Sequence, residues 1–150
     1  MDTGCNLRSL YLYMTHHQTL LVKRSWSIFQ KIDPVIVADV FYTKLFTDNP
    51  SLRPMFPADM SAQYVKLIDM INMIIARLDN PCAFLSEVGE MAKKHTGYGV
   101  KPRHYMMVGA ALLWTLEKGL GCDWTVDMKE AWTICYGNLS EIILRSLQEA

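Results

Sequence analysis

Residues 90–102 read EMAKKHTGYGVKP, and this stretch carries the most information about the fold. Phe84, Val88, Met91 and His95 are spaced by four, three and four residues. This spacing places them on one face of a helix. Gly97 then stops the helix. We therefore expect His95 to lie on the last turn of an amphipathic helix and to point into the interior.

A histidine at this position has two interpretations. The last turn of a helix has carbonyl groups without intrahelical partners, and one of them can hold a ring N–H in a fixed orientation. This bond selects the tautomer and makes the other ring nitrogen a better metal ligand. His95 can thus ligate heme iron from one side of a buried cavity. On this helix alone, the alternative is a core histidine bonded to the same carbonyl.

Length and composition predict one globular domain. The chain has 150 residues, of which 51% are hydrophobic and 20% charged, which favours a packed fold over disorder. The ten methionines suit either an adaptable core or a lining for a flat apolar ligand. We expect residues 1–13 to form a flexible N-terminal extension and residues 14–150 to form the folded domain.

Charge and cysteine usage exclude several classes of function. Fifteen basic residues balance fifteen acidic ones without a basic stripe, so no nucleic-acid partner is expected. The four cysteines are scattered, which argues against zinc and covalent heme attachment and favours a reduced, cytoplasmic protein. The N-terminus makes a poor signal peptide, and no apolar run reaches the roughly 18 residues of a membrane helix. No membrane association is expected.

Capping signals divide the chain into helices. Thr15 with Gln18 forms a capping-box pattern for a first helix that runs to about Ile32. Asp33-Pro34 starts a second helix, and the prolines at 50, 54 and 57 predict a corner of short helical turns. A long helix follows from about Met60 to Leu78. The remaining start signals are Asn80-Pro81, Pro102 and Thr125.

Apolar stripes with helical spacing mark the expected buried faces. The third helix carries a strong stripe, and the helix after Pro102 carries Tyr105, Val108, Leu112, Leu113 and Leu116 on one side. No segment alternates with period two, so we expect an all-α fold of six or seven helices. Three other histidines lie near helix starts and are expected to be exposed: His16, His17 and His104.

The order and spacing of Tyr42, Phe56, Gln63 and His95 resemble the globin family. The similarity is strongest to bacterial single-domain globins and the heme domain of flavohemoglobins. Two strings carry most of it: FYTKLFTDNPSLRPMF at 41–56 and KKHTGYGVKPRHY at 93–105. The resemblance covers residues 15–147 and implies a globin fold of six to eight helices around a heme b pocket.

The resemblance also implies roles for single residues. His95 corresponds to the proximal iron ligand, and Phe56 to the corner phenylalanine that stacks on the heme. Tyr42 and Gln63 correspond to the polar pair on the distal side, with Leu67 as an apolar wall one turn after Gln63. Without the family, Phe56 and Leu67 are equally well explained as core. Without the family, Tyr42 is explained as a half-buried aromatic residue and Gln63 as a solvated surface residue.

On the proximal side the resemblance is incomplete. Lys94 corresponds to a cation that faces a heme propionate or a reductase, and Tyr105 to a proximal hydroxyl. In flavohemoglobins this tyrosine works with a glutamate near the end of the last helix. The matching position here is Leu147, with Glu149 two residues on. The resemblance therefore does not imply a complete proximal relay.

These residues favour a protein that binds oxygen, nitric oxide and carbon monoxide. Bound dioxygen carries partial negative charge, and each hydrogen bond to it contributes roughly 1.5 to 3 kcal/mol. Two such donors tighten binding by more than about a hundredfold, which favours scavenging or redox chemistry over oxygen delivery. The alternative is a nitric oxide dioxygenase. No glycine-rich dinucleotide fingerprint occurs, so that reaction is expected to need an external flavin reductase. A heme-based sensor and a heme-free bundle are the remaining alternatives.

Overall fold

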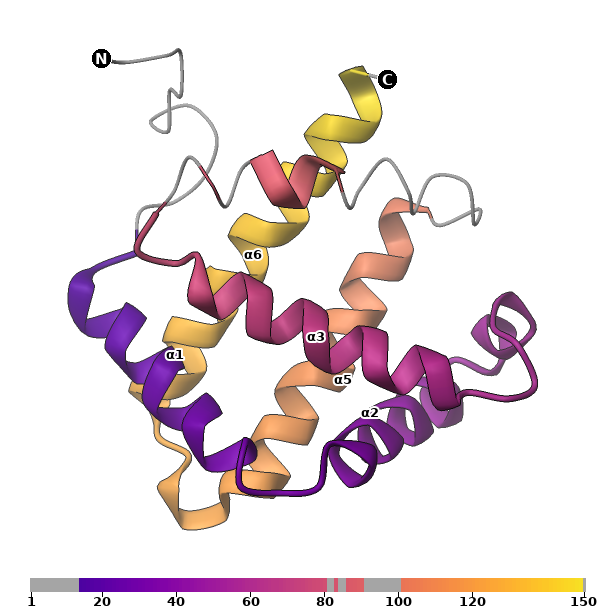
Figure 1. The fold of residues 1–150 in the computed structure, drawn as a ribbon, viewed down its shortest axis with the longest axis horizontal. Helices are drawn as coiled ribbons and strands as arrows, with labels where there is room; N and C mark the ends of the chain where they lie inside the picture. The colour runs from indigo at the N-terminus through magenta and orange to yellow at the C-terminus, as the bar shows by residue number, and fades with distance from the viewer. Residues whose placement is uncertain (1–13, 81–82, 84–85, 91–100, 150) are drawn as a thin grey trace.

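The computed structural model describes residues 14–80, 83, 86–90 and 101–149, and every regular element in these ranges is helical (Figure 1). The all-α class predicted from the sequence is therefore confirmed. In chain order the elements are α1 (His16–Phe29), α2 (Pro34–Asp48), η1 (Pro50–Met55), α3 (Ser61–Ala76), α5 (Pro102–Leu120), η2 (Gly121–Asp123) and α6 (Val126–Glu149). Residues 83 and 86–90 are also helical.

The first two helices begin where the capping signals place them. The Gln18 amide donates to Thr15 Oγ1 at 3.0 Å, and the Thr15 amide donates to Gln18 Oε1 at 2.9 Å, so the capping box is complete. Asp33 Oδ1 accepts from the Val35 amide at 2.9 Å, with Pro34 in the first turn of α2. Because 30–32 form a turn before this cap, α1 ends at Phe29, earlier than the expected Ile32.

The corner after α2 is a single 3-10 helix, as the prolines predict. Arg53 stabilises it from within, because its guanidinium donates to the carbonyl oxygens of Phe56, Pro57 and Ala58 at 3.2, 3.0 and 3.2 Å. The same guanidinium lies 5.3 Å from the centroid of the Phe46 ring. The corner therefore has a fixed shape, and it returns the chain so that α3 packs on α2.

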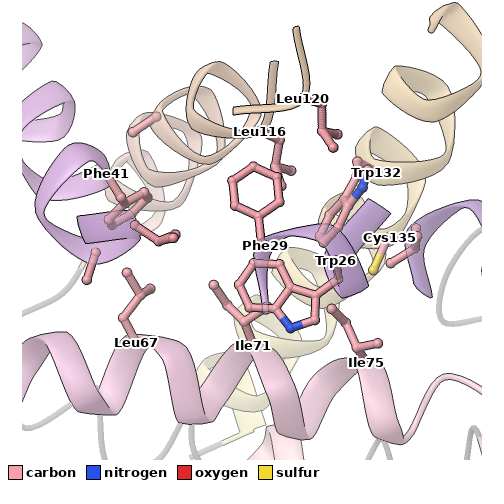
Figure 2. Packing of buried hydrophobic residues seen from close by; sticks show 14 of the residues in the cluster. Trp26, Phe29, Phe41, Leu67, Ile71, Ile75, Leu116, Leu120, Trp132 and Cys135 are labelled. Carbon is pink, nitrogen blue, oxygen red and sulfur yellow. The ribbon is translucent and has the colours of Figure 1, made fainter. Parts of the chain in front are cut away.

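The main core lies where α1, α2, α3, α5 and α6 meet (Figure 2). Trp26 stacks on Phe29 with 5.7 Å between ring centroids and meets the Trp132 ring edge-on at 6.4 Å. Both indole N–H groups are satisfied. Trp132 Nε1 donates to Ser25 Oγ at 2.8 Å, and Trp26 Nε1 donates to Asn72 Oδ1 at 2.7 Å.

The buried face of α5 differs from the expected stripe. Tyr105 and Leu116 are buried as predicted, whereas Val108, Leu112 and Leu113 are only half-buried. The reason is that α5 packs against both α2 and α6, so small residues between the stripes are enclosed as well. The additional buried residues are His104, Gly109, Ala111, Thr115 and Leu120.

One glycine shows how closely α5 and α6 approach. A Cβ added at Gly109 would lie 2.6 Å from Cε2 of the Tyr136 ring, so only a glycine admits this ring.

Among the described helices, none is both long and apolar enough to cross a bilayer.

Candidate functional site

Two polar side chains from different helices meet beside the core. Gln63 Nε2 on α3 donates a hydrogen bond to the Tyr42 hydroxyl oxygen on α2 at 3.0 Å. Tyr42 is 5% exposed and Gln63 is half-buried. The two residues are 21 positions apart, and the rigid corner at 50–55 brings them together. The structure thus joins two of the residues that the sequence singled out.

An aromatic cluster holds the Tyr42 ring in place. Its centroid lies 4.9 Å from Phe41, 5.7 Å from Phe46 and 5.6 Å from Phe56. A fourth ring, Tyr64, stacks on it at 5.7 Å with an interplanar angle of 15°. Phe56 is half-buried and lies in the corner, where the sequence placed it. With neighbours on several sides, the Tyr42 hydroxyl has one preferred direction.

Burial keeps the Tyr42 phenol neutral. Removal from water raises the pKa of Tyr42 to about 12, although the hydrogen bond from Gln63 and the nearby Tyr64 also act on it in opposite senses. Its oxygen already accepts from the Gln63 amide. The phenolic hydrogen therefore remains to be donated to a further acceptor at neutral pH.

An apolar cavity is lined by Phe41, the sequence neighbour of Tyr42, and not by Tyr42 or Gln63 themselves. Its walls come from α2, α3, α5 and α6, and Leu67, one turn after Gln63, contributes to the α3 side. Trp132 and Cys135 close it from α6, and burial raises the pKa of the Cys135 thiol to about 12, so the thiol stays neutral. Half-buried Val108 and Leu112 of α5 line the same space, which explains why the core does not enclose them fully.

A second buried phenol lies on α5, in a smaller apolar cluster that includes Ile74 and Val88. The Tyr105 hydroxyl on α5 is buried and has no hydrogen-bond partner within the part of the chain that the structure describes. Burial raises the pKa of Tyr105. The Tyr136 hydroxyl of α6 donates to the Tyr105 carbonyl oxygen at 2.5 Å and fixes the backbone beside it.

Sequence reasoning missed Tyr136. It lies four residues after Trp132 in a helix whose stripe was recognised, and opposite it is Gly109, the one residue type that leaves room for its ring. Gly109 inside a helical pattern was a signal that could have indicated a close contact with a large side chain on another helix.

Two predicted residues, His95 and Lys94, lie outside the described residues, as do all of residues 91–100. Within the helical residues 86–90, Val88 is fully buried, on the face that the sequence spacing assigns to His95. Within the described ranges, no cluster of three or more His, Cys, Asp or Glu side chains could bind a metal. The ligand role of His95 stays a prediction.

The expectation for His104 was wrong. His16 and His17 are exposed, but His104 is buried and its Nδ1 accepts from the Lys101 amide at 2.9 Å. Burial, with the charges of Arg103 and Lys101, lowers the pKa of His104. The His104 ring caps the N-terminus of α5 by accepting this hydrogen bond. Its position near a helix start did not predict this role.

Comparisons with known proteins agree with this geometry. A sequence model of the Globin family matches residues 39–143. A flavohemoprotein of Vibrio cholerae is 29% identical over 134 residues, covering 87% of this chain and 34% of its own length. A flavohemoprotein from Bordetella pertussis is 31% identical over 107 residues, which cover 69% of this chain and 27% of the relative. The chain thus spans about a third of the length of these curated relatives.

Solved structures show the same fold. A bacterial globin from Campylobacter jejuni superposes with a TM-score of 0.77 at 27% identity, covering 90% of this chain and 97% of the other. A hexacoordinated heme protein from an anhydrobiotic tardigrade superposes with a TM-score of 0.79, covering 90% and 96%, and its 17% identity supports the fold alone.

Proposed function

This chain belongs to the globin family, a family of heme-binding proteins, and we propose that it holds a b-type heme and reversibly binds diatomic gases there. Oxygen is the principal ligand of this proposal, with carbon monoxide and nitric oxide as the others. The observation that carries it is the Gln63–Tyr42 hydrogen bond, together with an apolar cavity lined by the nearby residues Phe41 and Leu67.

The residues present fit a heme. The cavity lining is dominated by aliphatic and aromatic side chains, which suit the flat apolar faces of a porphyrin. We assign His95 as the iron ligand, Phe56 and Leu67 as contacts to the ring, and Lys94 as a partner for a propionate. The Tyr105 hydroxyl, which is buried and has no hydrogen-bond partner among the described residues, supplies a further polar atom. When bound, the heme iron supplies the open coordination position for a diatomic ligand.

The polar pair then selects among gases. Gln63 donates to the Tyr42 oxygen and holds the phenol so that its hydrogen points away from the amide. A neutral O–H fixed in this way donates to a ligand that carries negative charge at little reorganisation cost. Losing one such bond costs roughly 1.5 to 3 kcal/mol, or about ten- to a hundredfold in affinity. Carbon monoxide, a weaker acceptor, gains less.

Ligand dissociation rates of Tyr42→Phe test this proposal. The ferrous protein should release oxygen about ten- to a hundredfold faster than wild type, because one charge-assisted hydrogen bond is lost. Carbon monoxide release should change much less. Phe41→Leu is a matched control, because it alters a neighbouring ring without a hydroxyl. An equal effect of Tyr42→Phe on both gases would contradict the proposal and indicate altered packing.

A second function, conversion of nitric oxide to nitrate, is favoured by the two polar groups at one site and by the similarity to flavohemoproteins. In this proposal a separate flavin reductase returns the electron, and Lys94 contributes to its docking. Rapid mixing of the oxygenated protein with nitric oxide should give ferric protein and nitrate in one turnover. A reaction slower than oxygen release would rule this function out.

The domain limits and compartment complete the proposal. We assign residues 14–150 to the globin domain and residues 1–13 to an extension. We also propose a reducing compartment such as the cytoplasm, because the four cysteines are scattered along the sequence.

A further inference from the structure

Tyr64 packs on the face of the Tyr42 ring and also bonds the helix that carries this ring. Tyr64 follows Gln63 on α3 and is partly exposed, and it stacks on Tyr42 with ring centroids 5.7 Å apart and planes 15° apart. Its hydroxyl donates to Asp39 Oδ1 on α2 at 2.8 Å. We propose that Tyr64 and Asp39 are positioning residues for oxygen binding. Their hydrogen bond fixes the direction in which the Tyr42 hydroxyl donates, and so sets how slowly oxygen leaves.

Gln63 and Tyr64 hold two different parts of the same side chain. The Gln63 amide donates to the Tyr42 hydroxyl oxygen at 3.0 Å, which fixes one end of the phenol. The stacked Tyr64 ring fixes the plane of the phenol, because the contact is lost when either ring turns. Asp39 lies three residues before Tyr42 on α2, and its bond to Tyr64 holds that ring over this stretch of the helix. The contacts therefore form a closed circuit between α2 and α3.

The other three rings that contact Tyr42 have a different place in the fold. Phe41 and Phe46 belong to α2 itself, so they stay beside Tyr42 when this helix moves, and Phe56 belongs to the corner that follows. None of the three has a polar atom in its side chain. Tyr64 comes from α3 and has a hydrogen bond back to α2. It therefore couples the direction of the Tyr42 hydroxyl to the spacing of the two helices.

The bond between Tyr64 and Asp39 persists at neutral pH. The hydrogen bond to the carboxylate is the largest cause that raises the pKa of Tyr64, followed by burial and the charge of Asp39, while the charge of Arg53 in the corner acts in the opposite sense. The neutral phenol thus keeps its proton to donate. Asp39 is exposed, so the bond that positions a buried donor lies at the surface. A surface substitution is therefore expected to alter the release of a buried ligand.

This proposal rests on the proposed gas-binding function, and it is tested by gas release from the ferrous, heme-loaded protein. Tyr64→Phe keeps the ring and removes the hydrogen bond, and Asp39→Ala removes the acceptor. Both should speed oxygen release by about two- to tenfold, the factor that corresponds to one ordinary hydrogen bond, and should leave carbon monoxide release nearly unchanged. Asp39→Asn should restore most of the wild-type rate, because its amide oxygen still accepts from the phenol.

Three further measurements separate positioning from a change in charge or packing. Asp69→Ala removes an exposed carboxylate from α3 and should leave both release rates at the wild-type value. Adding Tyr64→Phe to Tyr42→Phe should not speed oxygen release further, because Tyr64 acts through Tyr42. Phenol absorbance is then titrated with pH, and each curve is compared with that of the same protein carrying Tyr64→Phe. Tyr64 should ionise at lower pH in Asp39→Ala, because the bond that raises its pKa is gone.

The outcomes distinguish this proposal from the function on which it rests. Wild-type protein that retains no heme, or Tyr42→Phe that releases oxygen at the wild-type rate, would refute the proposed function. If Tyr42→Phe accelerates release while Tyr64→Phe and Asp39→Ala do not, the positioning role alone is wrong. Equal acceleration of both gases, further acceleration in the double variant, or an unchanged titration of Tyr64 in Asp39→Ala would also overturn it. The same rate in Asp69→Ala or in Asp39→Asn as in Asp39→Ala would overturn the role of the hydrogen bond.

Discussion

Two buried tyrosines, Tyr42 on α2 and Tyr105 on α5, differ in their partners. Burial raises the pKa of both Tyr42 and Tyr105, but only the Tyr42 hydroxyl has a partner among the described residues, the Gln63 amide. Tyr42 is positioned across two helices and a rigid corner. Tyr105 is held instead through its backbone by Tyr136. The comparison teaches that two buried phenols can be held in different ways. The position of the Tyr42 hydroxyl is set by the Gln63 amide, whereas the position of Tyr105 is set by the packing of α5 against α6.

The largest effect is expected when the proposed iron ligand is removed. His95→Ala should lose heme or fail to retain it, because noncovalent heme in this fold depends on the ligand bond and on apolar burial. Absorbance in the Soret region per mole of protein measures the loss, and added imidazole should partly restore it. Normal heme content in the variant would contradict the assignment of His95.

Packing between α5 and α6 is tested by Gly109→Ala. The new Cβ would lie 2.6 Å from the Tyr136 ring, so we expect a loss of about 1 to 2 kcal/mol in the free energy of unfolding. Gly137→Ala on α6 is the matched control, because a Cβ there meets nothing within 4 Å. The control should gain up to about 1 kcal/mol from helix propensity. Equal changes in denaturant titrations of both variants would show that Tyr136 shifts freely.

Alkaline pH tests the burial of Tyr42. Its folded pKa is about 12, against about 10 in an unfolded chain. The folded state therefore holds this proton more tightly between the two values. The free energy of unfolding should not change through Tyr42 below pH 10, and should fall as the pH rises toward 12. Denaturant titrations at several pH values should show a shallower fall for Tyr42→Phe. Identical slopes would place Tyr42 in contact with water.

The smallest effect is expected for Tyr105→Phe. Removing a buried hydroxyl without a partner should leave the free energy of unfolding within about 1 kcal/mol of wild type, or raise it slightly. Tyr136→Phe removes a hydroxyl that has a partner and should cost more. A loss larger than about 1 kcal/mol in Tyr105→Phe would show that this hydroxyl bonds a group outside the described residues.

The fold could be predicted where local chemistry decides it. The capping box at Thr15 and the Asp33-Pro34 cap place helix starts through bonds within one turn, and both are present. The prolines fixed the corner for the same reason. Local signals did not predict the buried face of α5, because that face is set by two neighbouring helices. They also failed for His104, which is buried and accepts a hydrogen bond from the Lys101 amide.

The candidate site required more than local reasoning. No spacing rule joins Tyr42 to Gln63 across 21 residues, and the resemblance to a family suggested the pair. The stacking of Tyr64 on Tyr42 was not predicted. The sequence of α3 does not show which of its partly exposed residues faces an aromatic ring of α2. The ligand role of His95 stays a prediction, as it lies outside the described residues.

A double-mutant cycle on oxygen dissociation tests most directly whether Gln63 acts by orienting Tyr42. Rates are measured by stopped flow for wild type, Tyr42→Phe, Gln63→Leu and the double variant. We expect Gln63→Leu to speed release as much as Tyr42→Phe or less, and to add little once Tyr42 is phenylalanine, because the two residues act through one hydrogen-bonded unit. Fully additive effects, with both single variants accelerating release, would contradict the account and show that each side chain acts on the ligand independently.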